Sequence, residues 1–283
     1  MKTAVLTMVY RDHWFLKQWL AYYGPRVGRK HLYVVSHGDE PEIRQIAAGC
    51  NIIPFERNTL ENFDQRRWAF LNRVQADLHQ IYDCVITGDV DELILHEDVD
   101  ASLIEVLEQF RDHHVAFAAG FDLVEDPRID HEFDDRQALL SQRKLGFWSA
   151  GYSKPLVSYK PVTYIPGAHR IRGANYFLAP GLLMAHLKYA DSRQSNERIQ
   201  IRDFILEEGG HTMKWNNPWR KQKFDGDPRK TQAFLEEPKA FEESYDYFTA
   251  QISEPKVGRG RGIGAPKVRE IIPFHLPDRF ERV

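Results

Sequence analysis

Apolar residues in the first part of the chain occur in two patterns, short unbroken runs and stripes that repeat every three or four positions. The short runs are rich in β-branched side chains and stop at glycine, proline or charged residues, which is typical of strands. They predict strands at residues 3–10, 32–36, 51–55 and 84–87. The stripes predict helices at residues 12–23, 41–48 and 63–82. This alternation favours a mostly parallel sheet with helices on its faces.

The first of these helices has recognisable boundaries in the sequence. Asp12 is suited to cap its N-terminus, and Leu16 and Leu20 share one of its faces. Gly24 and Pro25 are expected to end it, because proline lacks the N–H that a helix interior needs.

The pattern changes after a further helix expected at residues 102–111. Strands follow, some of them short and antiparallel, and then a helix. The strands are predicted at 115–123, 159–165, 176–179 and 181–187, and the helix at 193–208. The glycine-rich stretch from residue 253 has no strand before it, so it predicts an irregular arm and not a nucleotide-binding loop. We therefore expect one domain over residues 1–210 and, over 211–283, a C-terminal extension packed on it, helical and then irregular.

Composition and charge restrict the classes of protein to consider. The net charge of −3 argues against a nucleic-acid partner that depends on overall charge. Cys50 and Cys84 are expected to be free thiols. No apolar run approaches the about 18 residues of a membrane span, and the N-terminal run is too short for a secretion signal. A soluble, cytoplasmic protein is expected.

The most informative segment lies after the predicted strand 84–87, where Asp89, Asp91 and Glu92 follow within a few positions. Clustered carboxylates repel one another and lose hydration, so a cation is expected to compensate them. Asp89 and Asp91 are two residues apart and share one face of an extended chain. Oxygen ligands suit Mg²⁺, Mn²⁺ or Ca²⁺, which suggests a metal that handles a phosphate-bearing substrate. The alternative is an acidic strand end that turns into solvent.

Polar clusters also follow the first two predicted strands, at residues 10–12 and 36–39. The carboxyl ends of parallel strands meet at one edge of a sheet, where ligands bind. These clusters and the acidic segment are therefore expected to share one pocket.

Several short motifs follow one another in order between residues 3 and 202. They are Met8-Val9-Tyr10-Arg11-Asp12, Ile86-Thr87-Gly88-Asp89-Val90-Asp91-Glu92, Gly120-Phe121-Asp122-Leu123-Val124, Gln142-Arg143, Ser153-Lys154-Pro155, Pro166-Gly167-x-His169 and Ala185-His186-Leu187-Lys188-Tyr189-x-Asp191. In this order the chain resembles the family 2-like glycosyltransferases, in their bacterial branch near the family 92 enzymes. The resemblance implies an α/β fold of the GT-A type, with a mostly parallel sheet flanked by helices and a small antiparallel part. Residues 1–210 would be its nucleotide-sugar-binding catalytic domain, and the extension would lie on the acceptor side.

The resemblance also implies a metal, Mn²⁺ or Mg²⁺, that acts as a Lewis acid on a departing nucleoside diphosphate. Asp91 would be a direct ligand, and Asp89 would contact the ribose or a metal-bound water. His186 would complete the metal shell, with an ordinary core or surface histidine as the alternative.

Further residues are implied on the donor side. Tyr10 and Asp12 would recognise the base and ribose. Lys154, Arg143 and Arg11 would neutralise the diphosphate, and for each a solvated surface charge is the alternative. His37 and His169 are also expected to contact the donor. Residues 65–67 of the long helix are expected to form a solvated face.

An inverting transfer needs a base for the acceptor hydroxyl. Asp126 and Asp191 are the candidates that we favour, with Asp122 and Glu125 as alternatives. Trp215, Trp219 and residues 245–248 are candidate platforms for an acceptor sugar, and ordinary packing is an equal alternative.

The function that follows is transfer of a sugar, expected to be a hexose, from a nucleotide donor, UDP-linked by preference, to a saccharide or glycolipid hydroxyl in surface polysaccharide synthesis. Peripheral contact with the inner membrane and the oligomeric state are left open. One alternative is a non-catalytic nucleotide-sugar-binding scaffold. The other is a magnesium-dependent phosphohydrolase of the haloacid dehalogenase type. It is disfavoured because the acidic pair of that family ends the first strand, whereas the pair in this chain ends the fourth.

Overall fold

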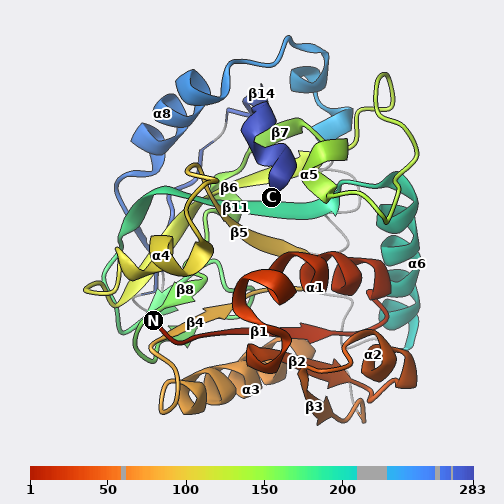
Figure 1. Ribbon diagram of the computed structural model, residues 1–283, viewed down its shortest axis with the longest axis vertical. Coiled ribbons are helices and arrows are strands. Elements are labelled where there is room, and N and C mark those ends of the chain that lie inside the picture. Colours follow the sequence, from red (N-terminus) through yellow and green to blue (C-terminus); the bar gives the residue numbers. More distant parts are fainter. Residues whose placement is uncertain (59–61, 209–227, 259–261, 269) are drawn as a thin grey trace.

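A large mixed sheet with helices on both faces forms the body of the molecule (Figure 1). The computed structural model describes residues 1–58, 62–208, 228–258, 262–268 and 270–283, with the backbone alone at 202–208 and 230. In the sheet the strands follow the order β14-β7-β6-β8-β4-β1-β2-β3, and β11 pairs with both β6 and β5. This architecture confirms the predicted α/β class, including a smaller antiparallel sheet of the order β12-β13-β10-β9.

The first part of the sheet is parallel, as the sequence predicts. β1 (Thr3–Val9) pairs in parallel with β2 (Leu32–His37) and β4 (Cys84–Thr87), and β2 pairs in parallel with β3 (Asn51–Phe55). The helices between these strands are α1 (His13–Val27), α2 (Pro41–Ile46) and α3 (Phe63–Leu78).

Side chains of β1 alternate between two apolar cores. Val5 and Val9 pack in the cluster that contains α1, whereas Leu6 and Met8 pack in the cluster that contains Trp68 of α3. α1 and α3 accordingly lie on opposite sides of β1 (Figure 1). Because β1 is buried on both faces, its carboxyl end is held in a fixed position between the two helices.

The predicted end of α1 at Gly24 and Pro25 is wrong. The helix continues through Pro25 to Val27. Its C-cap is Gly28, whose φ is 89° and whose N–H donates to Gly24 O over 3.0 Å. A proline removes only one hydrogen bond from the helix. The apolar face that includes Leu16 and Trp19 is fully buried and outweighs that loss.

The middle of the chain supplies the second part of the sheet. Its strands are β5 (Glu92–His96), β6 (Val115–Val124), β7 (Leu145–Trp148), β8 (Val157–Ser158) and β11 (Leu178–Tyr189). Its helices are α4 (Leu103–Glu108), α5 (Leu139–Gln142) and α6 (Ser192–Glu208). β11 runs parallel to β6 on one side and antiparallel to β5 on the other.

The separate strands predicted at 176–179 and 181–187 form one strand, β11. Pro180 and Gly181 do not end the strand. They lie in an irregularity of the strand, where the register with β6 shifts between Leu178 and Leu183. Gly181 has a φ of 68°, which a residue with a side chain adopts only with strain.

The C-terminal stretch is more regular than predicted. It contains α8 (Phe241–Ile252), β12 (Lys256–Val257), β13 (Ile263–Gly264) and β14 (Pro273–His275). β13 pairs with β10 (Ile171–Arg172), which also pairs with β9 (Thr163–Tyr164), and β14 joins the main sheet beside β7. Trp215 and Trp219 lie outside the described residues. None of the helices that the structure describes has the length and apolar character needed to cross a bilayer.

Candidate functional site

A pocket of about 380 Å³ lies at the carboxyl ends of β1, β2 and β4. Helix α6 stands on the side of the molecule towards which β1 points (Figure 1). The pocket brings together most of the residues that the sequence singles out, namely Tyr10, Asp12, His37, Asp89, Asp91, Lys154, His169 and His186. It is also lined by Phe63, Asp64, Arg67, Tyr152 and Arg198.

The acidic segment forms the tight connection between β4 and β5. The Asp89 N–H donates to Glu92 Oε2 over 3.0 Å, and the Glu92 N–H donates to Asp89 O over 3.1 Å. The Asp91 carbonyl accepts from Leu187 N of β11 over 2.8 Å. Asp91 and Glu92 are each 2% exposed, so the segment turns into the protein and not into solvent.

Three basic side chains compensate the three carboxylates. Arg67 forms an ion pair with Asp89, and Arg198 forms one with Asp91. Lys154 Nζ lies 2.5 Å from Glu92 Oε1 and 3.6 Å from Asp89 Oδ2. Both arginines lie in the pocket, so the solvated face predicted at 65–67 is wrong for Arg67.

These charges determine the protonation of the acidic segment. Burial would raise the pKa of Asp91, but Arg198 and His186 outweigh burial and hold that pKa well below its usual range. Arg67 and Lys154 likewise lower the pKa of Asp89 against the effect of burial. At Glu92 burial dominates and raises the pKa despite Lys154. Asp89 and Asp91 therefore present negative charge to the pocket.

His186 lies between two carboxylates because of the strand register. It stands opposite Asp122 of β6 and opposite Glu92 of β5. Its Nδ1 is 2.6 Å from Asp122 Oδ1, its Nε2 is 3.2 Å from Asp91 Oδ2, and the ring of Tyr152 stacks on it at 3.7 Å. Burial would lower the pKa of His186, but Asp91 and Asp122 raise it.

The Nε2 of His186 and the carboxylate of Asp91 are suitable ligands for a divalent cation. When Nδ1–H donates to Asp122, the Nε2 lone pair faces an oxygen of Asp91, and two such acceptors require a proton or a cation between them. Within the described part of the chain no set of three His, Cys, Asp or Glu side chains forms a complete metal site. Asp91 and His186 would therefore hold the cation together with substrate oxygens and water.

One wall of the pocket is aromatic. His37 stacks on Phe63 at 4.9 Å and meets the edge of Tyr10 at 5.6 Å, and the guanidinium of Arg57 lies 4.1 Å from the Tyr10 ring centroid. Burial and the nearby Arg57 lower the pKa of His37 to about 4, so its ring is neutral near pH 7. Neutral planar rings provide a surface on which a base or a sugar can stack.

Of the two charged residues that follow β1, Asp12 lines the pocket and Arg11 does not. Asp12 precedes α1 but makes no side-chain cap hydrogen bond; its Oδ1 instead lies 3.2 Å from Arg198 Nε. Asp12 is thus the N-cap residue of α1, as predicted, but its carboxylate serves Arg198 and not the helix N-terminus. Arg11 does not line the pocket, and its Nε lies 3.2 Å from Glu40 Oε1.

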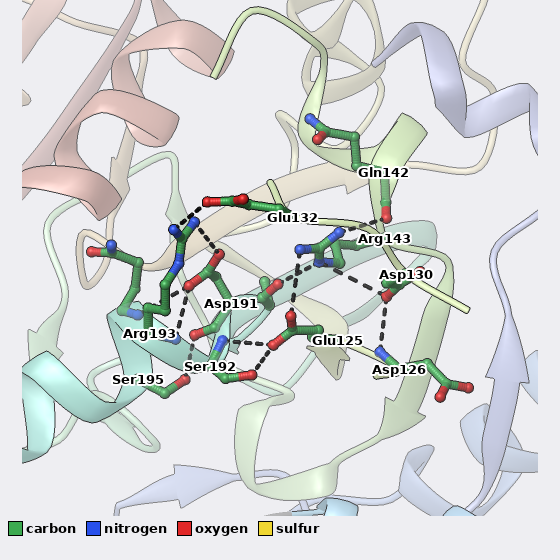
Figure 2. A network of polar contacts seen from close by, with 12 residues as sticks. Glu125, Asp126, Asp130, Glu132, Gln142, Arg143, Asp191, Ser192, Arg193 and Ser195 are labelled. Carbon is green, nitrogen blue, oxygen red and sulfur yellow. Dashed lines mark hydrogen bonds and ion pairs between the residues drawn. The ribbon is translucent and has the colours of Figure 1, made fainter. Parts of the chain in front are cut away.

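Arg143, Asp126 and Asp191 do not line the pocket either, and belong to the polar network in Figure 2. Arg143 is 1% exposed, donates through Nε to Ala190 O over 2.6 Å, and lies 3.8 Å from both Glu125 and Asp130. Asp191 accepts from the N–H groups of the first turn of α6, over 2.9 Å and 3.1 Å. Asp126 accepts from Arg128. The catalytic roles of the two aspartates stay predictions.

The sequence reasoning missed the positions of Arg67 and Arg198 and the contact between Asp122 and His186. Arg198 lies more than a hundred residues from its partner Asp91 along the chain. Nothing in the sequence around Arg198 indicates that distant partner. The strand register that places Asp122 beside His186 is also a long-range property.

Comparison with protein-family models and with curated proteins finds no match. Among solved structures, the chain is similar to mannose-1-phosphate geranyltransferase from Thermus thermophilus, at 15% identity and a TM-score of 0.28, over 45% of this chain and 43% of that one. Core-mannan synthase A from Aspergillus fumigatus, in its Mn/GDP form, is 8% identical over 46% of this chain and 44% of its own, with a TM-score of 0.26. S. aureus TarS is 10% identical over 89% of this chain and 48% of its own, with a TM-score of 0.35. The chain thus spans less than half the length of each, and at these TM-scores the likenesses assign neither a fold family nor an activity.

Proposed function

We propose that this protein is a metal-dependent glycosyltransferase that takes a sugar from a nucleoside diphosphate. The observation that carries the proposal is the convergence of Asp91 and His186 in a pocket that also holds Lys154, Arg67 and an aromatic wall. Each of these parts matches one part of such a donor. The rings match the base, the basic side chains match the diphosphate, and the acid–imidazole pair matches the cation that accompanies it.

The residues of the pocket would divide the work as follows. Tyr10 and His37 would stack with the base, while Asp12 and Asp89 would accept hydrogen bonds from ribose hydroxyls. Lys154 would stabilise negative charge on the departing diphosphate, since it is buried and already faces the acidic segment. The divalent cation, when bound, would supply Lewis-acid stabilisation of the same charge.

UDP is the donor nucleotide that we propose, and a saccharide or glycolipid hydroxyl in surface polysaccharide synthesis is the proposed acceptor. His169 would line the diphosphate or acceptor side, because it borders the pocket and its Nδ1 lies 2.6 Å from Gly151 O. A cytoplasmic location with peripheral contact to a membrane is part of the same proposal.

The proposal is tested by calorimetric titration of UDP and UDP-sugars with and without Mn²⁺. We expect UDP to bind only when Mn²⁺ is present, and the Asp91→Asn variant to lose at least about tenfold in affinity while keeping its thermal midpoint. Asp126→Asn is the matched control, since Asp126 is also a buried aspartate but lies outside the pocket. Unchanged binding in Asp91→Asn would refute the assignment.

Two further results would identify the alternatives. Binding of UDP-sugars without transfer or donor hydrolysis would indicate the non-catalytic scaffold. Release of phosphate from simple phosphomonoesters, with no response to nucleotide sugars, would indicate the phosphohydrolase.

A further inference from the structure

Arg198 occupies a particular position among the basic residues of the pocket. Its guanidinium forms an ion pair with Oδ2 of Asp91, and its Nε lies 3.2 Å from Asp12 Oδ1. The same Oδ2 of Asp91 lies 3.2 Å from Nε2 of His186. Arg198 therefore neutralises the oxygen that Asp91 would offer to a cation shared with His186.

The charges of the pocket show why this contact matters. The acidic groups at the pocket outnumber the basic ones, five against three. They are Asp12, Asp64, Asp89, Asp91 and Glu92 on one side and Arg67, Lys154 and Arg198 on the other. A divalent cation added to Asp91 alone would stand beside the positive charge of Arg198, and the two like charges would repel each other. A cation that arrives with a diphosphate brings negative charge as well, and this charge offers Arg198 a new partner.

The beginning of helix α6 is firmly anchored, as Figure 2 shows. Asp191 accepts from two N–H groups of its first turn, and the Ser192 N–H donates to Glu125 over 2.7 Å. The Ser195 hydroxyl donates back to the Asp191 carbonyl over 2.9 Å. Arg198 follows Ser195 by three residues, so its Cα stands about one turn beyond this anchor.

The guanidinium of Arg198 also lies over an aromatic ring, since its Cζ is 4.7 Å from the centroid of the Phe15 ring of α1. The head group can exchange one anionic partner for another by rotation of its side-chain torsions, without displacement of the helix. A planar guanidinium suits phosphate oxygens as well as carboxylates.

From these contacts, and on the basis of the proposed function, we propose that Arg198 is an internal counter-ion that competes with the divalent cation for Asp91. In the absence of donor it neutralises Asp91 and Asp12. When the donor binds with its cation, Arg198 leaves Asp91 and binds the diphosphate. The cation and the donor therefore bind cooperatively, and Arg198 links the two events.

The test measures Mn²⁺ binding without nucleotide, by the electron paramagnetic resonance signal of free Mn²⁺. Arg198→Gln is expected to bind Mn²⁺ about tenfold more tightly than the unaltered protein, because the competing charge is gone. The same variant is expected to bind UDP about tenfold more weakly at saturating Mn²⁺, because the diphosphate loses a partner. Opposite changes in the two affinities are the signature of the exchange.

Arg193→Gln is the matched control, since Arg193 lies on the same helix but is exposed and pairs with Glu132. It is expected to leave both affinities unchanged. Arg198→Met keeps a long unbranched side chain without the charge, and it replaces the Gln variant if that one does not fold. Mn²⁺ affinity that is unchanged or weaker in a folded Arg198 variant would overturn the inference.

Failure of the inference is distinguishable from failure of the proposed function. If the unaltered protein binds Mn²⁺ and Asp91→Asn does not, the metal site stands whatever Arg198 does. If Asp91→Asn binds Mn²⁺ and UDP like the unaltered protein, the proposed function itself fails.

Discussion

His186 shows how a single side chain acquires its chemistry from neighbours that are distant in sequence. The imidazole is 4% exposed and has a carboxylate at each ring nitrogen, with Asp122 at Nδ1 and Asp91 at Nε2. A carboxylate on the far nitrogen fixes the tautomer and makes the near nitrogen a better ligand. The position of Asp122 therefore favours an orienting role over the base role considered for it in the sequence.

The orienting role of Asp122 gives a first prediction. Asp122→Asn is expected to lower Mn²⁺ affinity by about 10- to 100-fold, because His186 loses the negative partner that orients its ring. Calorimetric titration of Mn²⁺ would measure this, with Asp126→Asn as the control near the end of the same strand. Equal Mn²⁺ affinities in the two variants would contradict the orienting role.

Asp191 gives a second prediction at this scale, which distinguishes a role as N-cap of α6 from a role as the catalytic base. Its Oδ1 accepts from the N–H groups of Arg193 and Gln194, as an N-cap does. Asp191→Ala is expected to cost about 1 kcal/mol in the free energy of unfolding, whereas Asp191→Asn should keep most of it, since asparagine also caps. Urea denaturation would measure both. A stable Asn variant that has lost sugar transfer would instead support the predicted base.

At the scale of elements, the position of Tyr152 depends on a glycine in β6. A Cβ at Gly120 would lie 2.1 Å from the backbone carbonyl of Tyr152, whose ring stacks on His186. The Ser153 hydroxyl also accepts from the Gly120 N–H across the same contact, over 3.0 Å. The close approach of these two backbones thus places one wall of the pocket.

A third prediction follows from this contact. Gly120→Ala is expected to destabilise the protein by about 1–3 kcal/mol and to weaken metal binding, because the segment that carries Tyr152 must move away. Gly151→Ala is the control, since a Cβ there meets only Ser149 Oγ at 3.7 Å. Thermal denaturation and Mn²⁺ titration would be compared for both variants. Similar values for the two would show that the Tyr152 segment adapts without cost.

Elements whose signals are local could be predicted from the sequence. Residues 51–55 and 84–87 form strands with the predicted bounds, because their apolar runs stop at strong local signals. Pro180 and Gly181 are equally strong local signals, yet β11 continues through them because β5 and β6 pair with it on both sides. β14 was missed for the same reason, since only its pairing with β7 makes it a strand.

At the scale of the whole molecule, the sequence located the pocket but not its charge balance. Asp89, Asp91 and residues 10–12 could be placed together because parallel strands align their carboxyl ends. Arg198 enters the pocket from a helix that follows β11, and Arg67 from the first turns of α3. The rotation of a helix about its axis depends on packing over the whole fold, so these two contacts could not be predicted from local pattern.

Buried histidines give a final prediction, which concerns the stability of the whole protein. Burial lowers the pKa of His79 to about 4 and, together with Arg57, that of His37 to about 4, both from the ordinary 6.5. Above about pH 6.5 both groups are neutral in the folded and unfolded chains, so their contribution to stability is complete. As the pH falls from about 6.5 to about 4, only the unfolded chain takes up protons, and the free energy of unfolding decreases.

His79→Gln isolates one of these contributions, because glutamine does not titrate and can still reach Ser158 Oγ, which lies 3.1 Å from His79 Nε2. Urea denaturation would measure the free energy of unfolding at about pH 7.5 and about pH 5. Its loss between these two pH values is expected to be smaller by about 1 kcal/mol in the variant, a value reduced for the partial exposure of the ring. Carboxylates titrate equally in both proteins, so the difference between the two losses belongs to His79. Equal losses would show that His79 takes up its proton as readily in the folded chain as in the unfolded one.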